Sequence, residues 1–216
     1  WARYPNNALF GYQYAITLIK DKQLDKALDV LNRVIRLKNK KLPYITALVY
    51  FRKGEIFFKK NQYKTAIKQY EIFLDSSKEL DFTGLAALNT AICYKTLGNE
   101  AQFKQNLVLA KGGNQDVFED SYAKQKSEQY LDFEILPVEL KLIRLKNYID
   151  AGKDQLAYDS LKVDITRIEN NEIKAVALSY LAEAALNLKK YSDVIHAADQ
   201  VESLNVASEE WTLPMT

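Results

Sequence analysis

The chain has 216 residues, with 30 Lys and Arg against 28 Asp and Glu, seven Gly, four Pro, one Cys and one His. So few Gly and Pro argue against an all-β fold, which needs a turn every ~8–12 residues, and 48% apolar residues argue against a disordered chain. A single Cys excludes an internal disulfide and a multi-Cys metal site, and a single His excludes a His-rich metal centre.

The charge balance does not favour a nucleic-acid partner. The formal net charge is +2, whereas phosphate binding calls for a larger, clustered basic excess. The short basic runs at 38–41, 59–60 and 189–190 fall beside predicted helix ends, where lysines complement the helix dipole. No apolar run approaches the ~18–20 residues that span a bilayer. We predict no nucleic-acid partner and no membrane span in this segment.

Small and apolar residues recur at helical spacing on both sides of short polar breaks, which predicts a series of antiparallel helix hairpins. The clearest copy places the small Gly54 and Ala66 where two helices approach most closely, with Phe57, Tyr63 and Tyr70 around the crossing. Four further copies follow the template less closely. Their residues at the position of Gly54 are Ala15, Ala91, Leu145 and Ala182.

This pattern resembles the tetratricopeptide repeat (TPR). That family has a small residue at its eighth position, aromatic residues at the eleventh and seventeenth, Ala at the twentieth and a bulky residue at the twenty-fourth. Gly54, Phe57, Tyr63, Ala66 and Tyr70 match these positions in order. The resemblance covers five degenerate repeats, at about 8–41, 45–80, 84–112, 137–167 and 172–204, in a single domain over residues 1–216. It implies an all-α fold, a right-handed α-solenoid (superhelix) of stacked antiparallel hairpins.

Between the third and fourth repeats, residues 113–136 exceed what a hairpin needs. The segment follows Gly112 and predicts a linker and an additional amphipathic helix over about 117–130. Its expected apolar face consists of Val117, Phe118, Tyr122 and Tyr130. Pro43 and Pro137 are expected to start hairpins, since Pro is favoured in the first helical turn.

The two ends of the chain suggest a fragment of a longer repeat array. Pro5 falls where the family closes the second helix of a preceding repeat; an ordinary Pro-led helix start is the alternative. Trp211 lies in a segment expected to cap the last hairpin or open another. Because the chain begins with Trp1, a signal peptide or anchor upstream stays open, and no localisation is predicted beyond a soluble domain.

The residue types needed for catalysis are scarce. His196 sits within a predicted helix, and nothing near it resembles a nucleophile elbow. Cys93 is most simply a small core residue. The adjacent carboxylates Glu119 and Asp120 point about 100° apart on a helix, and acids at a helix N-terminus explain them. We predict that the chain is not an enzyme and that it has no catalytic, cofactor-binding or metal-binding residue.

The resemblance also implies a binding surface. In the family, the second, fifth, ninth, twelfth and thirteenth positions of each first helix line a concave groove. Transferred to this sequence, these positions predict that the part of the groove formed by the first three repeats is aromatic and aliphatic. In those three repeats the groove positions begin with Leu9, Leu48 and Leu85. The part formed by the last two repeats is predicted to be polar, and it includes Asp150, Ser179, Glu183 and Asn187. The predicted protein-binding residues are Tyr12, Ile16, Phe51, Glu55, Phe58, Lys59, Leu88, Ile92, Lys95 and Lys146.

An exposed apolar strip of this kind is unfavourable unless something covers it. The first hypothesis is therefore a non-catalytic protein–protein interaction scaffold that binds a peptide or helix in the groove. The alternative is an architectural or oligomerisation module of a larger repeat protein, whose groove is filled by its own additional helix and whose array ends self-associate. A clamp for a terminal carboxylate is disfavoured, because Ile16 stands where that clamp needs Asn.

Overall fold

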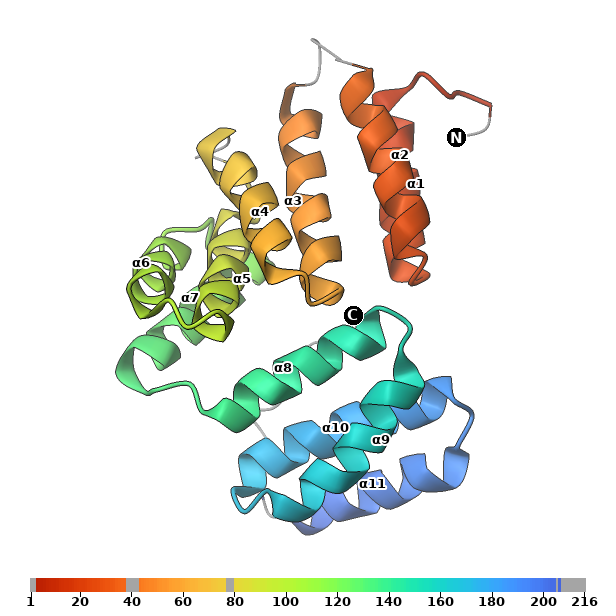
Figure 1. Cartoon of the computed structure of the whole chain (residues 1–216), viewed down its shortest axis with the longest axis vertical. Helices are drawn as coiled ribbons and strands as arrows, with labels where there is room; N and C mark the ends of the chain where they lie inside the picture. The colour runs from red at the N-terminus through yellow and green to blue at the C-terminus, as the bar shows by residue number, and fades with distance from the viewer. Residues whose placement is uncertain (1–2, 38–42, 77–79, 205, 207–216) are drawn as a thin grey trace. The chain divides into compact units, whose positions relative to one another are not determined.

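The computed structural model describes residues 3–37, 43–76, 80–204 and 206 (Figure 1). Over these residues the chain forms eleven α-helices and one short 3₁₀ helix, and it contains no strand. Its contacts divide it into two compact units, Trp1–Leu136 and Pro137–Thr216, and each unit is described by itself. The continuity of one solenoid over residues 1–216 stays a prediction. Trp211 lies outside the described residues.

Unit 1 contains seven helices. They are α1 (Ala8–Lys20), α2 (Leu24–Arg36), α3 (Pro43–Lys59), α4 (Tyr63–Ser76), α5 (Thr83–Thr96), α6 (Glu100–Ala110) and α7 (Phe118–Asp132). Unit 2 contains α8 (Pro137–Asp150), α9 (Asp154–Asp164), the 3₁₀ helix η1 (Ile165–Arg167), α10 (Asn171–Asn187) and α11 (Tyr191–Ser203). As predicted, Pro43 begins α3 and Pro137 begins α8.

Helices that follow one another in the chain pair as hairpins, and each hairpin stacks on the one before it within its unit. In unit 1, α3 packs on both α1 and α2, and α5 packs on α4 and α3. In unit 2, α10 packs on both α8 and α9. The predicted fold class, an all-α solenoid of TPR-like helix hairpins, is confirmed in this arrangement.

The five hairpins share one turn geometry, and this confirms the register of the repeats. The residue seven positions after each small position has a positive φ, between 56° and 78°; these residues are Lys22, Asn61, Gly98, Gly152 and Lys189. The next residue donates its backbone N–H to the carbonyl five residues earlier, at 2.8–2.9 Å in all five turns. This bond pattern closes a helix with a left-handed residue and satisfies its last carbonyls.

The small residue Gly54 allows α3 and α4 to approach closely. A Cβ atom at this position would lie 2.5 Å from Cδ1 of Tyr70, which leaves no room for a side chain. Tyr70 and Ala66 of α4 are both fully buried. The predicted crossing of these two helices is therefore confirmed.

We predict that Gly98→Ala lowers the free energy of unfolding by about 1 kcal/mol, because an L-residue is strained at φ 78°. No atom lies within 4 Å of an added Cβ, so the cost comes from the backbone alone. Urea denaturation measures it. The matched change Lys189→Gly, at the same turn position of the fifth hairpin, is expected to raise stability by a similar amount. Effects of equal sign for the two variants would contradict this account.

The additional helix α7 forms as predicted, but it buries a different face. Phe118 is 59% exposed, and Val117, Tyr122 and Tyr130 are only partly buried. The buried residues are Asp120, Ala123 and Ser127, which recur at helical spacing. The predicted bulky apolar face is therefore wrong. Small and polar residues face the interior because α7 packs on α5 and α6 as the next helix of the stack.

Candidate functional site

Four of the ten predicted binding residues are buried. Tyr12 on α1, Phe51 on α3, and Leu88 and Ile92 on α5 are at most 7% exposed. The expectation of an exposed apolar strip is wrong at these positions, because neighbouring first helices pack closely enough to cover them. These side chains stabilise the stack and offer little surface to a partner.

Phe51 lies at the centre of the core that joins the second and third hairpins. Its ring stacks on that of Phe82 at 5.0 Å between centroids and contacts the rings of Phe73 at 5.3 Å and Tyr70 at 6.1 Å. Its side chain is fully buried. Aromatic contacts of this kind add to the free energy gained by burial alone.

Arg52 links the first two hairpins through a nearly buried polar cluster that the sequence did not reveal. Its Nη1 lies 2.6 Å from Oε2 of Glu55, and its Nε donates to the hydroxyl of Tyr12 at 3.2 Å. The guanidinium also lies over the rings of Phe51 and Phe82. Burial alone would lower the pKa of Arg52, but Glu55 and Tyr12 outweigh it and raise the pKa. The predicted groove residue Glu55 is thus paired within the chain.

Lys95 is also paired within unit 1. Its Nζ lies 2.8 Å from Oε2 of Glu100 and 3.7 Å from Oε1 of Glu134, and it sits 5.0 Å from the centre of the Phe103 ring. Only 14% of its side chain is exposed. The hydrogen bond to Glu100 raises the pKa of Lys95 and outweighs the effect of its burial. This lysine therefore fastens α5 to α6 and to the residues after α7.

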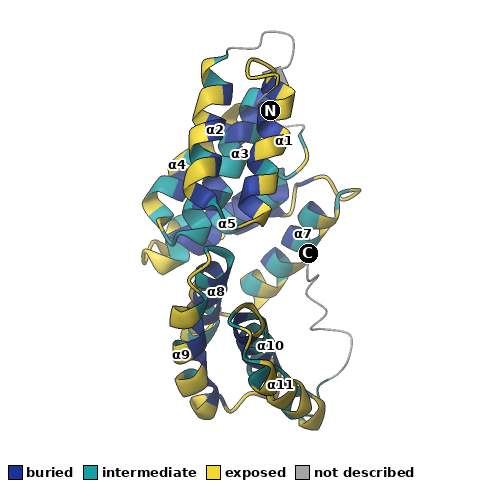
Figure 2. Cartoon of the chain, turned by 90° about the vertical axis from the view of Figure 1, so that its right-hand side faces the viewer, coloured by how far each residue is buried: buried dark blue, intermediate teal, exposed yellow. Residues whose placement is uncertain are grey.

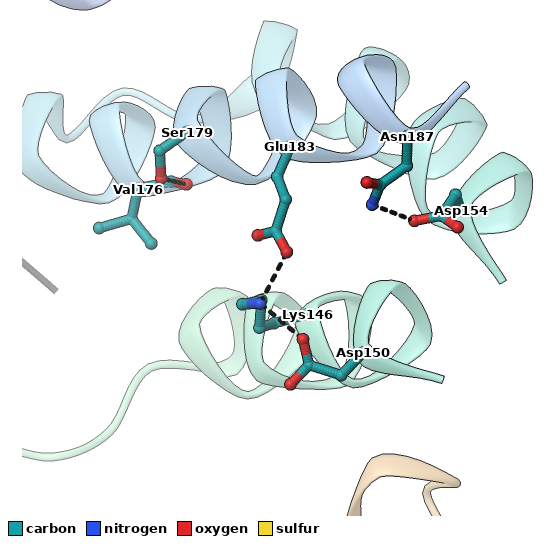
Figure 3. Close-up of polar contacts among 7 residues, drawn as sticks. All are labelled: Lys146, Asp150, Asp154, Val176, Ser179, Glu183 and Asn187. Atoms are coloured by element: carbon teal, nitrogen blue, oxygen red, sulfur yellow. Dashed lines mark hydrogen bonds and ion pairs between the residues drawn. The ribbon is translucent and has the colours of Figure 1, made fainter. Parts of the chain in front are cut away.

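Three polar groove residues of unit 2, Lys146, Asp150 and Glu183, bond to one another (Figure 3). Nζ of Lys146 on α8 lies 2.6 Å from Oδ1 of Asp150 on the same helix and 3.0 Å from Oε1 of Glu183 on α10. Burial would lower the pKa of Lys146, but the two carboxylates outweigh it and raise the pKa. Nearby, Nδ2 of Asn187 donates to Oδ1 of Asp154 at 2.7 Å. These contacts hold α10 on the α8–α9 hairpin.

At the predicted groove positions of α1, α3 and α5, five apolar side chains remain partly or largely exposed. This first-helix strip consists of Leu9, Ile16, Leu48, Phe58 and Leu85. It lies on neighbouring helices, since α3 contacts both α1 and α5. Leu48, Phe58 and Leu85 pack against the core cluster at their bases, so they are held in place. Lys59, the remaining predicted binding residue, is half-buried beside Phe58.

The candidate catalytic groups lie in surroundings that do not activate them. Cys93 is fully buried, and burial raises the pKa of its thiol, which disfavours the reactive thiolate. His196 is exposed on α11, with its Nε2 2.7 Å from Nε2 of Gln200. Among the residues with described positions, no group of three or more His, Cys, Asp or Glu could hold a metal ion.

Asp120 carries a buried carboxylate. The sequence predicted for it only the role of an acidic residue near the N-terminus of its own helix. Its Oδ1 accepts from the backbone N–H of Leu85 at 2.9 Å, and its Oδ2 accepts from that of Asn114 at 3.0 Å. It fits because Gly84 and Gly113 have no side chains; a Cβ at Gly113 would lie 2.8 Å from its Cγ. Burial raises the pKa of Asp120, and these backbone donors oppose the shift. The sequence signal that could have indicated this buried carboxylate is the presence of the two glycines, Gly84 and Gly113, that leave space for Asp120.

The hairpins, their shared turns and the internally paired charges define an all-α helical repeat protein with a TPR-like fold. No family model matches the chain, and no curated protein matches it. Among solved structures, it is similar to a crystal structure of nearly identical TPR-like repeats attributed to a kinesin light chain of Podosopora anserina. The two are 13% identical, the match covers 93% of this chain and 95% of that chain, and the TM-score is 0.43. No helix within the described ranges is both long and apolar enough to cross a membrane.

Proposed function

We propose that this chain is a protein-interaction scaffold that binds an apolar helix or extended peptide of a partner protein on the first-helix strip. The observation that supports this is the arrangement of Leu9, Ile16, Leu48, Phe58 and Leu85 on three adjacent helices. All five are at least partly exposed, and the last three pack against the core cluster. Ordered apolar side chains of this kind contribute binding energy at little entropic cost. The predicted groove charges Glu55 and Lys95 are already paired within the chain, so the partner is bound mainly by its apolar face.

The alternative, a groove filled by the chain's own additional helix, has less support. Helix α7 packs on α5 and α6, and it leaves Leu9, Ile16 and Leu48 partly or largely exposed. The predicted contribution of Lys146 to partner binding also has less support than the strip, because its ammonium is held by Asp150 and Glu183.

The proposal is tested by selecting peptides from a displayed library on the purified protein and measuring their dissociation constants. We expect Ile16→Glu with Leu48→Glu to weaken the selected peptides about 10-fold or more, because a charge on the strip opposes an apolar ligand. The matched control is Ile72→Glu, an exposed apolar residue on α4. Peptides that bind the double variant as tightly as the unchanged protein, or a library that yields no binder, would contradict the proposal.

A further inference from the structure

Helix α7 occupies the place of a first helix in the stack of unit 1, but it lacks a second helix. It packs on α5 and α6 just as α3 packs on α1 and α2. Asp120, in its first turn, accepts the backbone N–H of Leu85 in the first turn of α5, so the two helices begin at the same end of the stack. In the part of unit 1 that the structure describes, no helix follows α7. The fourth hairpin of this unit is therefore incomplete.

The open face of α7 is mostly polar. Only three of its fifteen residues are buried, whereas α5 buries eight of its fourteen (Figure 2). After Phe118 at the start of the helix, the exposed residues that follow one another at helical spacing are Ser121, Gln125, Gln129 and Asp132. A polar outer face is typical of the element that ends a repeat stack, because this face needs no further hairpin to cover it.

Helix α8 lacks the buried face that other first helices turn toward a preceding hairpin. On α5 and α10, the third and seventh positions of the TPR register are buried; these residues are Ala86, Thr90, Ala177 and Leu181. Ala86 shares a core cluster with Ala66 and Ile67 of the hairpin before it. The equivalent residues on α8 are Leu140, which is half-buried, and Arg144, which is exposed.

Two cations at or beside this face of α8 are held by contacts within unit 2. Nε and Nη2 of Arg144 donate to the hydroxyl of Tyr148 at 3.2 and 3.0 Å. Nζ of Lys141 lies 2.6 Å from Oδ1 of Asp164, and 53% of the lysine side chain is exposed. Covering these charges with another helix would remove their hydration, which is unfavourable. The first helix of unit 2, like the last helix of unit 1, is therefore suited to solvent and not to a stacked hairpin.

We propose that the chain holds two helix stacks that unfold independently, with α7 as the cap that ends the first stack and α8 as the helix that begins the second. This departs from the single continuous solenoid that the sequence predicts. The stability of a repeat stack is roughly the sum of its repeats and of the interfaces between neighbouring repeats, so a polar cap inside the chain divides its cooperativity. A partner that binds one unit then stabilises that unit alone.

Hydrogen exchange of the full chain, followed by mass spectrometry, tests the proposal with one core variant in each unit. Leu107→Ala on α6 and Leu178→Ala on α10 each truncate a fully buried side chain. Each is expected to speed exchange of the slowest amides of its own unit about 30-fold or more. The slowest amides of the other unit should stay within about 2-fold of the unchanged chain. The matched controls are Leu109→Ala and Leu186→Ala, at exposed positions of the same two helices, which should leave both units unchanged.

Faster exchange in both units by similar factors, from either core variant, would overturn the proposal, because one continuous solenoid unfolds as a whole. A core variant that changes its own unit no more than the exposed control does would overturn it as well. If Leu107→Ala unfolds unit 1 entirely, unit 2 should still keep its slowly exchanging amides, and their loss would count against the proposal. Peptide binding on the first-helix strip enters none of these measurements, so this proposal and the proposed function fail independently.

Discussion

Replacing Phe51 with alanine is expected to lower the free energy of unfolding of unit 1 by about 3–5 kcal/mol, the range for a fully buried phenylalanine. The ring is fully buried and contacts those of Tyr70, Phe73 and Phe82. The loss combines the burial of the ring, its aromatic contacts and the cavity left between the second and third hairpins. Urea denaturation followed by circular dichroism measures it.

The matched control is Phe58→Ala. Phe58 lies on the same helix, α3, and was also predicted to line the groove. Phe58 is only half-buried, and its ring contacts that of Tyr63 at 6.2 Å, so the expected loss is about 1 kcal/mol. The two variants separate a core role from a surface role. If Phe51→Ala cost no more than Phe58→Ala, the assignment of Phe51 to the core would be wrong.

The turns of the hairpins were predictable because their signals are local. Gly98 and Gly152 stand where the chain needs a positive φ, and Gly54 stands where Tyr70 leaves no space for a side chain. Lys22 and Lys189 adopt the same turn conformation without a glycine. Neither residue type indicates a left-handed turn, so these two turn residues were not identified from the sequence.

By contrast, the sequence did not predict which of the groove residues on the first helices are exposed and which are buried. A register assigns Leu48 and Phe51 to the same side of α3, but Leu48 is partly exposed while Phe51 is fully buried. The difference depends on how closely α1 and α5 stack on α3, which reflects the sizes of many side chains at once. Likewise, the sequence shows that Lys95 and Lys146 lie near the groove but not which carboxylates neutralise them, because Glu134 and Glu183 are distant in the chain.

Asp120 has a large structural role because it caps the N-terminus of helix α5. The residue before α5, Phe82, has a left-handed conformation and provides no side-chain cap. Asp120 of α7, 35 residues further along the chain than Leu85, accepts the N–H of Leu85 instead. A carboxylate at a helix N-terminus also interacts favourably with the helix dipole. The same side chain accepts the N–H of Asn114 and so ties α7 to the loop after α6.

Asp120→Ala is therefore expected to lower the free energy of unfolding of unit 1 by about 2–4 kcal/mol, because it leaves two partly buried backbone N–H groups without their acceptor. Asp120→Asn keeps the shape and one acceptor oxygen and should cost about half as much. Urea denaturation gives the free energies, and hydrogen exchange at the amides of Leu85 and Asn114 reports the lost bonds. Both amides should exchange faster in the alanine variant.

Asp116→Ala is the matched control, since Asp116 is an exposed acid just before the same helix. If Asp120 acted only as an acid near the start of α7, the two alanine variants would lose similar, small amounts of stability and the Leu85 amide would keep its protection. A much larger loss for Asp120→Ala, with faster exchange at Leu85, would instead show that the start of α5 depends on a carboxylate supplied by α7.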